Sequence, residues 1–376
     1  MIRGILYSLP LSSKILLGKM KSFTNIKKIQ AMRNIVVKND DQFKNLNSNG
    51  YKKNLCEFLK ASFYNATETQ EYIEYLYEDK VTLVSNGKFE KNNPTIICVV
   101  KNEIDKLGIF FQHYKRIGEF NYIFIDNGST DDTCKFIIEN GATLYSCHSS
   151  FSTNRKVAWI NKVYSTIPEG CWTILLDADE LLVFDGYEDK SINEVLTSFE
   201  KNGITCGGAI MIDMFSTKPV SKEEYISKYV YFENRFHEER SYYFNSVYGG
   251  IREREFKHGR DRMFLIKKHP VIRKTVNTML VHCHYNYPFI RNMDSKIYFG
   301  LLHYKLFDSE IEKYKNIAKE GNYENGSNEY KSYLSIMNNK EYEEIFYESE
   351  NTVEYKGTES LIKINCLRDV REIYYE

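Results

Sequence analysis

The sequence lacks several features that would place it in a narrow class. Its eight cysteines are scattered along 376 residues and form no CxxC pair. This spacing argues against a zinc ribbon and against a small disulfide-stapled scaffold, so we expect a reducing compartment. The 51 basic and 51 acidic residues cancel, so net charge gives no reason to expect nucleic acid as a partner.

Long apolar runs are also missing. No stretch of the sequence approaches the roughly 18 consecutive apolar residues needed to span a bilayer, and residues 2–17 lack a small-residue cleavage site. We therefore expect a cytoplasmic protein. Residues 14–33 carry six Lys or Arg among apolar residues. That pattern suits a peripheral helix on the inner face of a membrane, although an ordinary solvated helix face is the simpler interpretation.

The composition is that of a globular protein, with 42% hydrophobic and 27% charged residues. Residues 1–90 are polar and rich in Lys and Asn, and we interpret them as a mainly helical N-terminal extension. A larger globular domain is expected over 91–320, in two halves (91–185 and 186–320). Residues 321–376 are interpreted as a polar, partly helical tail.

From Pro94 onward, apolar runs alternate with segments of helical periodicity. This alternation predicts a parallel α/β sheet. The predicted strands are 95–100, 121–125, 142–147 and 172–176, and the predicted helices are 104–117, 131–141 and 154–165.

Polar residues follow three of these predicted strands at the point where each strand ends. They are Asn102, the segment 126–129, and the segment 177–180. In an open α/β sheet, ligands bind beyond the carboxyl ends of the strands. This coincidence predicts a binding site at that edge of the sheet.

Asp177 and Asp179 flank Ala178 directly after the buried run Trp172–Leu176. Two carboxylates at this spacing can both reach one Mg²⁺ or Mn²⁺ ion if the chain bends there, and such an ion commonly bridges to substrate phosphates. A helix cap or a solvated turn is the alternative interpretation. We expect Glu180 to support this site from behind.

Three segments together resemble the family 2 type of glycosyltransferase, which has the GT-A fold. They are Val99–Glu103, Ile125–Thr133 and the segment Trp172–Leu182 with its Asp-Ala-Asp-Glu core. The resemblance implies a mixed, Rossmann-like sheet flanked by helices. It implies a catalytic domain over 91–320, with nucleotide-sugar binding in 91–185 and acceptor binding in 186–320. It also implies transfer from a nucleotide-diphosphate sugar, with a UDP-sugar as the first choice, and a divalent metal on Asp177 and Asp179. The common family form has two acidic residues before the Gly, whereas here the second is Asn127.

The remaining donor-side residues follow from the strand ends and from this resemblance. Arg155 and Lys156 open the helix before the fourth strand and can meet a diphosphate, or form a solvated first turn. The segment 249–254 resembles a Gly-Gly-x-Arg motif, and we interpret it as a polar loop or short strand. The expected donor-binding residues are Asn102, Asp126, Asn127, Ser129, Arg155, Asp177 and Arg252.

Histidines in the second half are candidate metal ligands. Late histidines often complete the metal shell in GT-A enzymes, which makes His303 the candidate third ligand beside Asp177 and Asp179. His282 and His284 would share one face of a strand. They suit zinc, the donor metal or, more simply, a polar surface near the cleft.

An inverting transfer also needs a carboxylate that deprotonates the acceptor hydroxyl. Glu253, Asp213 and Asp261 are the candidates for this catalytic base, with Glu253 preferred because it follows the Gly-Gly turn. The acceptor is expected to be a glycan or a lipid-linked molecule in surface polysaccharide synthesis. The alternatives are a metal-dependent nucleotidyl- or phosphotransferase and an inactive sugar-binding module. A P-loop, which would favour phosphotransfer, is missing from the sequence.

Overall fold

A computed structural model describes most of the chain from residue 75 onward. The described residues are 75–76, 78–221, 223–240, 245–256, 264–275, 278–287, 296–305 and 310–367. Most of the predicted N-terminal extension, its basic segment and Asp261 therefore lie outside the described residues. Within these ranges, no helix is long and apolar enough to cross a membrane.

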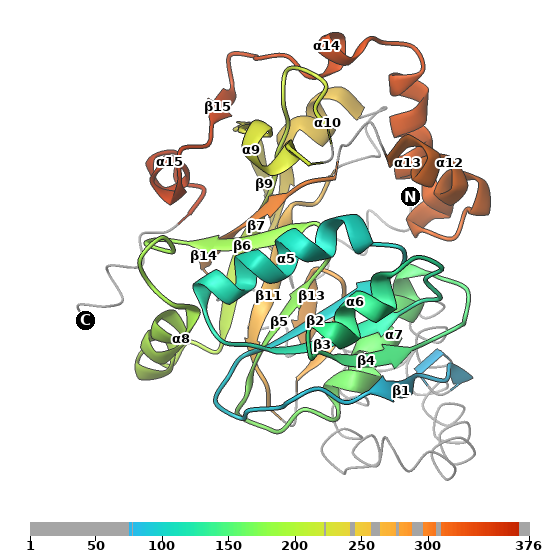
Figure 1. The fold of residues 1–376 in the computed structure, drawn as a ribbon. Helices are drawn as coiled ribbons and strands as arrows, with labels where there is room; N and C mark the ends of the chain where they lie inside the picture. Colours follow the sequence, from blue (N-terminus) through green and yellow to red (C-terminus); the bar gives the residue numbers. More distant parts are fainter. Residues whose placement is uncertain are drawn as a thin grey trace, which may run out of the picture.

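A mixed sheet of nine strands forms the centre of the fold, in the order β1-β4-β3-β2-β5-β11-β7-β14-β6 (Figure 1). Strands β4, β3, β2 and β5 run parallel to one another, whereas β11 runs antiparallel to both of its neighbours. The strands are β1 (Thr82–Ser85), β2 (Thr95–Val100), β3 (Asn121–Asp126), β4 (Thr143–Ser146), β5 (Trp172–Leu176), β6 (Glu180–Phe184), β7 (Cys206–Asp213), β11 (Lys267–Arg273) and β14 (Ile297–His303).

Helices cover both faces of the parallel part of this sheet. Along β2, Ile96 and Cys98 pack in the core that holds α5, whereas Ile97 between them packs in the core that holds α7. Side chains on a strand alternate between faces, so a continuous apolar run is buried on both sides. The helices here are α5 (Ile104–Ile117), α6 (Thr133–Glu139), α7 (Thr153–Tyr164) and α8 (Ile192–Lys201), and Figure 1 shows α5 and α6 in front of the sheet.

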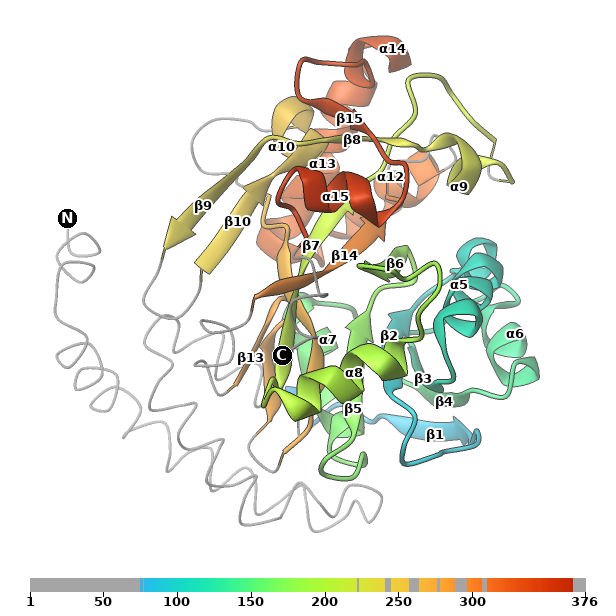
Figure 2. The ribbon, with the colours of Figure 1, turned by 90° about the vertical axis from the view of Figure 1, so that its left-hand side faces the viewer.

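The second half of the chain adds short strands and helices around the end of the sheet that β7, β14 and β6 form (Figure 2). The hairpin of β9 with β10 and the pair β8 with β15 lie there, and β12 with β13 forms a further hairpin. These elements are β8 (Tyr231–Glu233), β9 (Phe236–Arg240), β10 (Asn245–Gly249), β12 (Met279–His282), β13 (Tyr285–Tyr287), β15 (Thr352–Glu354), α9 (Tyr225–Lys228), α10 (Gly250–Phe256), α12 (Ile311–Glu320), α13 (Glu324–Met337), α14 (Tyr342–Ile345) and α15 (Thr358–Lys363).

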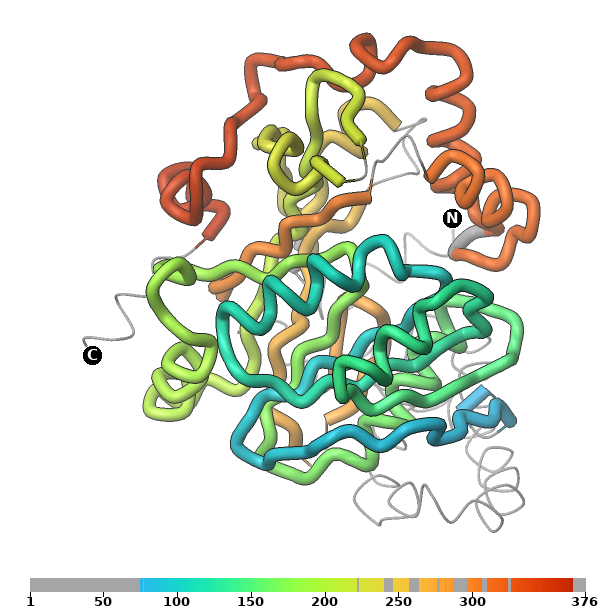
Figure 3. Tube along the Cα trace, viewed as in Figure 1, coloured from blue at the N-terminus to red at the C-terminus, as the bar shows by residue number. Residues whose placement is uncertain are grey.

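The C-terminal segment is an integral part of the fold, although its polar composition suggests a tail. Figure 3 shows it, in orange to red, running around the outside of the second half. Tyr330 and Tyr333 of α13 and Phe346 after α14 are buried with Ile251 and Phe256 of α10. Tyrosine rings supply much of this core, because a tyrosine can bury its ring while its hydroxyl finds a partner.

The sheet also begins earlier than expected. Strand β1 falls inside the range assigned to the N-terminal extension, yet it pairs antiparallel with β4. Just before it, the buried carboxylate of Asp79 accepts hydrogen bonds from Trp159 Nε1 at 2.6 Å and from Ser149 Oγ at 2.8 Å. The part of the fold that supports α7 therefore starts before residue 91.

Two predictions for the second half were wrong. The segment 249–254, expected as a loop or short strand, ends β10 and begins helix α10. The single strand expected to carry both His282 and His284 is a hairpin of two strands, β12 and β13. Both errors involve short elements whose apolar residues are too few for a clear period.

We expect Asp79→Ala to destabilise the protein more than the same substitution at any surface aspartate. The substitution leaves the indole N–H of the fully buried Trp159 and a hydroxyl without their acceptor, at a cost of about 2–4 kcal/mol. Thermal unfolding measures this loss. Asp132→Ala, at an exposed position before α6, is the matched control, and equal melting temperatures for the two variants would contradict the role of Asp79.

Candidate active site

The acidic segment after β5 presents two carboxylates to solvent and one to the interior. The side chains of Asp177 and Asp179 are 33% and 19% exposed, whereas that of Glu180 is 0% exposed. Glu180 Oε2 accepts a hydrogen bond from the backbone N–H of Asp177 at 3.0 Å. Glu180 therefore fixes the bend that brings the two aspartates to the surface, which is the supporting position expected for it.

Two ammonium groups lie on the carboxylate of Asp177. Lys156 Nζ from α7 binds Oδ1, and Lys268 Nζ from β11 lies 3.4 Å from Oδ2 while it also binds Glu180. Burial alone would raise the pKa of Asp177, but Lys156 and Lys268 hold it well below its usual value. Asp177 is therefore an ionised group at neutral pH.

Asp179 and Asp213 lie on opposite sides of the imidazole of His303. Nδ1 of His303 is 2.6 Å from Asp213 Oδ1, and Nε2 is 3.6 Å from Asp179 Oδ2. Burial lowers the pKa of His303, but Asp179 and Asp213 together raise it above its usual value. Asp213 is only 2% exposed, so it orients the ring from within the protein.

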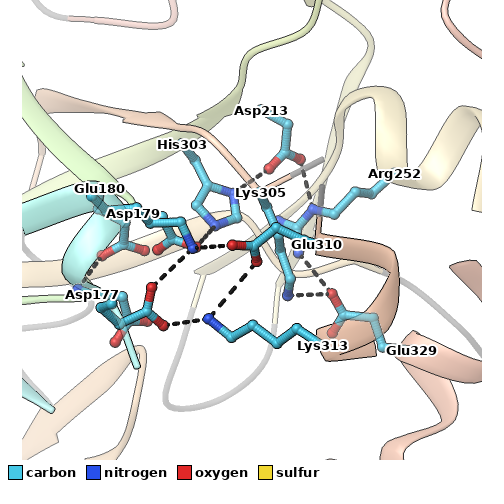
Figure 4. A network of polar contacts seen from close by, with 12 residues as sticks. Asp177, Asp179, Glu180, Asp213, Arg252, His303, Lys305, Glu310, Lys313 and Glu329 are labelled. Atoms are coloured by element: carbon cyan, nitrogen blue, oxygen red, sulfur yellow. Dashed lines mark hydrogen bonds and ion pairs between the residues drawn. The ribbon is translucent and has the colours of Figure 1, made fainter. Parts of the chain in front are cut away.

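The polar chain continues from Asp213 into the helices of the second half (Figure 4). Arg252 Nε donates to Asp213 Oδ2 at 2.7 Å, and its Nη1 donates to Glu329 Oε1 at 3.3 Å. Lys305 Nζ donates to the same Glu329 oxygen at 2.8 Å. Hydrogen bonds and ion pairs therefore connect Asp179 to helix α13.

Strand register brings these side chains together from distant parts of the sequence. Strand β14 pairs with β7 and with β6, so that His303 lies beside Asp213 on one side and Glu180 on the other. On β11, Val271 pairs with Ile174 of β5. Three residues further along the antiparallel pair, Lys268 comes opposite Asp177.

A second group of charges lies where α5 begins. Lys106 Nζ is 2.9 Å from Glu310 and 3.0 Å from Glu103, and Lys313 Nζ is 2.6 Å from Glu103. Glu310 and Lys313 belong to the start of α12, as Figure 4 shows. Ion pairs therefore hold α12 against the start of α5, next to the acidic segment.

The loops after β2 and β3 are locked to each other. Asn102 has φ +54°, its backbone N–H donates to Ser129 Oγ at 2.9 Å, and its Oδ1 accepts from Thr130 N at 2.7 Å. An asparagine tolerates this left-handed conformation better than most residues. The predicted site residues Asn102 and Ser129 are thus brought together.

Asp126 and Asn127 make local contacts instead of facing open space. The carboxylate of Asp126 accepts from the backbone N–H groups of Gly128 and Ser129 at 3.0 and 3.1 Å. The amide of Asn127 donates to the carbonyl groups of Cys147 and Ser149. Both side chains are buried and shape the turn after β3, so the expected contact of Asp126 and Asn127 with a donor stays a prediction.

Arg155 and Lys156 point to different partners. Arg155 Nη1 donates to Ser150 Oγ at 2.7 Å, and its guanidinium lies 4.4 Å from the ring of Tyr75. Lys156 is the residue that reaches Asp177. Of the two, therefore, Lys156 lies at the acidic segment and Arg155 stabilises the start of α7.

Arg252 is engaged inside the protein instead of lying open to a diphosphate. Its side chain is buried between Asp213 and Glu329. The preceding Gly250 has φ +77°, and a Cβ there would lie 3.2 Å from Asp213 Oδ2. The Gly-Gly turn therefore allows α10 to approach Asp213 closely, and the close approach is to protein, not to ligand.

His282 and His284 do not share a strand face, because β12 ends at the first and β13 begins after the second. Nδ1 of His284 is 2.9 Å from the carbonyl oxygen of Lys267. Burial, with help from Lys268 and Lys156, lowers the pKa of His282 to about 4. His282 is therefore neutral at physiological pH and lies near the two lysines that bind Asp177.

The candidate bases occupy different environments. Asp213 is buried between Arg252 and His303, which engage both of its carboxylate oxygens. Its role as the base stays a prediction. Glu253 Oε1 is 3.7 Å from His237 Nδ1 on β9, outside the polar chain that leads to Asp179. Asp261 lies outside the described residues.

Sequence reasoning missed Lys268, Lys106, Lys305 and Glu329 as members of the site. Their signals were weak, because single charged residues carry no motif. Lys268 was not conspicuous either, because its strand also carries Lys267, His269 and Arg273.

The predicted metal ligands need a separate test. Within the described ranges, no group of three or more His, Cys, Asp and Glu side chains is arranged to hold a metal ion. The donor set still suits a hard divalent ion, because Asp177 and Asp179 supply partly exposed carboxylate oxygens. For a metal to bind, Asp177 must release at least one ammonium group.

We expect Glu329→Gln to destabilise the protein more at neutral pH than at acidic pH. Burial raises the pKa of Glu329, but Lys305 and Arg252 lower it to a net value well below the usual range. A depressed folded-state pKa gives stability that is present above the unfolded value of about 4.3 and is lost as pH falls below it. The expected loss at pH 7 is about 1–2 kcal/mol.

Melting temperatures of wild type and Glu329→Gln between pH 8 and pH 3 test this. The gap between them should narrow below about pH 4.3. Glu320→Gln, at an exposed end of α12, should show no gap at any pH. A constant gap for Glu329→Gln would argue against the charge of Glu329 as the cause.

Gly250→Ala should cost more stability than the matched change Gly141→Ala. Both glycines have positive φ, +77° and +73°, so both substitutions carry backbone strain of about 1 kcal/mol. Only at Gly250 does the new Cβ crowd a carboxylate, since nothing lies within 4 Å of the Cβ at Gly141. Urea unfolding compares the two, and equal midpoints would mean that Asp213 moves aside freely.

Comparison with known proteins adds little to this geometry. No family model matches the chain, and no curated protein matches it. Among solved structures, the chain is similar to the crystal structure of S. aureus TarS, with 13% identity over 34% of this chain and a TM-score of 0.25. The match spans 23% of TarS, and a similarity this low carries no argument. The case for a function therefore rests on the site itself.

Proposed function

We propose that this protein is a metal-dependent glycosyltransferase of the GT-A type. It would transfer a sugar from a nucleotide-diphosphate sugar, first of all a UDP-sugar, to a hydroxyl group. The observation that carries the proposal is the pair of ionised, partly exposed carboxylates of Asp177 and Asp179 beyond the carboxyl end of β5. They lie at the edge where ligands bind in α/β sheets.

The surroundings of this pair support a transferase more than a structural turn. A capping carboxylate needs only local partners, whereas Asp179 is joined through His303, Asp213 and Arg252 to Glu329 of α13. Buried ionic groups cost desolvation energy, and a structural turn alone gives no reason for a network of this size. Perturbed, paired charges at a strand-end site are typical of functional sites.

Roles for individual residues follow from their contacts. Asp177, Asp179 and His303 are the residues that would hold Mn²⁺ or Mg²⁺, and the ion would neutralise charge that develops on the leaving diphosphate. Asp213 acts through His303: it accepts a hydrogen bond from Nδ1, which leaves Nε2 directed at Asp179. Carboxylate–histidine pairs of this kind orient metal ligands in other proteins.

Fewer observations bear on the catalytic base and on the acceptor. Both carboxylate oxygens of Asp213 are engaged by Arg252 and His303, so we keep Glu253, the preferred candidate, as the proposed base of an inverting transfer. A glycan or lipid-linked acceptor in surface polysaccharide synthesis, at the inner face of a membrane, fits the basic segment 14–33. That part of the proposal rests on the sequence alone.

Nucleotide-dependent thermal stabilisation tests the proposal most directly. UDP, GDP and CMP are each added to the full-length protein with Mn²⁺ or with EDTA. A ligand at about 100 times its Kd stabilises the native state by roughly 2.7 kcal/mol, which corresponds to a rise of a few °C. We expect at least one nucleotide to give such a rise with Mn²⁺ and a smaller one with EDTA.

Asp179→Ala should lose the metal-dependent part of this stabilisation and the hydrolysis of the matching donor sugar. Asp189→Ala, an exposed aspartate in the turn after β6, is the matched control and should behave as wild type. If none of the three nucleotides stabilises the wild type, the glycosyltransferase proposal fails. If Asp179→Ala keeps full donor hydrolysis, the metal assignment fails.

A further inference from the structure

Two lysines from different elements, α7 and β11, converge on the carboxylate of Asp177. Asp177 and Glu180 carry two negative charges, and Lys156 and Lys268 bring two positive ones. Lys268 alone would compensate the fully buried Glu180. Lys156 is added from another element, α7, onto a carboxylate that is already one-third exposed, where water could solvate it.

Both ammonium groups are held charged. Burial lowers the pKa of each lysine, but Asp177 and Glu180 raise it above the usual value in both cases. Their side chains are 15% and 7% exposed. A charged ammonium with an exposed carboxylate as its partner can exchange that partner for a stronger anion that arrives from solvent.

Charge balance shows which ligand this arrangement accepts. The four side chains together are neutral, so a divalent cation that bound Asp177 alone would add two uncompensated positive charges beside two ammonium groups. A diphosphate carries the opposite charge and many acceptor oxygens. It can take both ammonium groups and so release the oxygens of Asp177.

We propose that Lys156 and Lys268 bind the diphosphate of the donor and exchange Asp177 for it, so that diphosphate binding frees Asp177 for the metal. This rests on the proposed function, whose donor carries a diphosphate. Metal and diphosphate therefore bind in a mutually favourable way.

Two binding measurements on the full-length protein test the exchange without any turnover. Inorganic pyrophosphate with EDTA is titrated by calorimetry, and Mn²⁺ alone is titrated by its electron paramagnetic resonance signal. Lys156→Met should weaken pyrophosphate binding by roughly tenfold or more, because one charge-assisted contact is lost. The same variant should bind Mn²⁺ alone more tightly than wild type, because Asp177 loses a competing cation.

Opposite changes for the two ligands are the decisive result, since a merely structural role of Lys156 would weaken both or neither. Lys331→Met, at an exposed position on α13, is the control and should match wild type. Lys268→Met can leave the buried Glu180 uncompensated, so it is combined with Glu180→Gln. That double variant should show the same pair of opposite changes.

The inference is overturned if wild type does not bind pyrophosphate, or if Lys156→Met and the double variant keep wild-type affinity for it. These outcomes are separate from failure of the proposed function, which is judged by nucleotides and Mn²⁺ on wild type and Asp179→Ala. Pyrophosphate binding that depends on the lysines, with no nucleotide effect, would leave the diphosphate site standing and remove the glycosyl transfer.

Discussion

The site depends on one buried carboxylate, Asp213, which is shared by two cations from different elements. It accepts from His303 of β14 and from Arg252 of α10, and it ends β7. Removing either cation would leave an ionised group in the interior, which costs several kcal/mol. Three elements that the sequence separates by tens of residues are therefore held in one arrangement, and the orientation of His303 toward Asp179 follows from it.

The same dependence explains why the C-terminal helices belong to the site. Arg252 has donors left after Asp213, and Glu329 of α13 takes one of them together with Lys305. At the other end, Glu310 and Lys313 of α12 pair with Lys106 and Glu103 at the start of α5. The acidic segment thus lies between two sets of ion pairs, one completed by α13 and the other by α12. Tyrosine packing against α10 keeps these two helices in place.

The sequence was most informative where structure is local. Strands β2, β3 and β5, with the polar residues at their ends, follow from apolar runs of the right length, and all of them lie in one parallel sheet. Contacts that depend on strand register and burial could not be predicted from the sequence. Lys268 meets Asp177 only because β11 pairs antiparallel with β5. The helix α10 was missed because its arginines look solvent-exposed in sequence, whereas they are buried against Asp213 and Glu233.

The site uses arginine where a contact is fixed and lysine where we propose that a contact exchanges. Arg252 lies at the permanent junction, where a planar guanidinium can donate in several fixed directions to Asp213 and Glu329. At Asp177 the cations are lysines, whose compact ammonium groups move on flexible stems and keep no fixed geometry. A guanidinium there would hold Asp177 by two parallel bonds and compete with a metal for both oxygens. Lysines release the carboxylate more readily. A site that binds a divalent metal ion and a diphosphate together requires such a release.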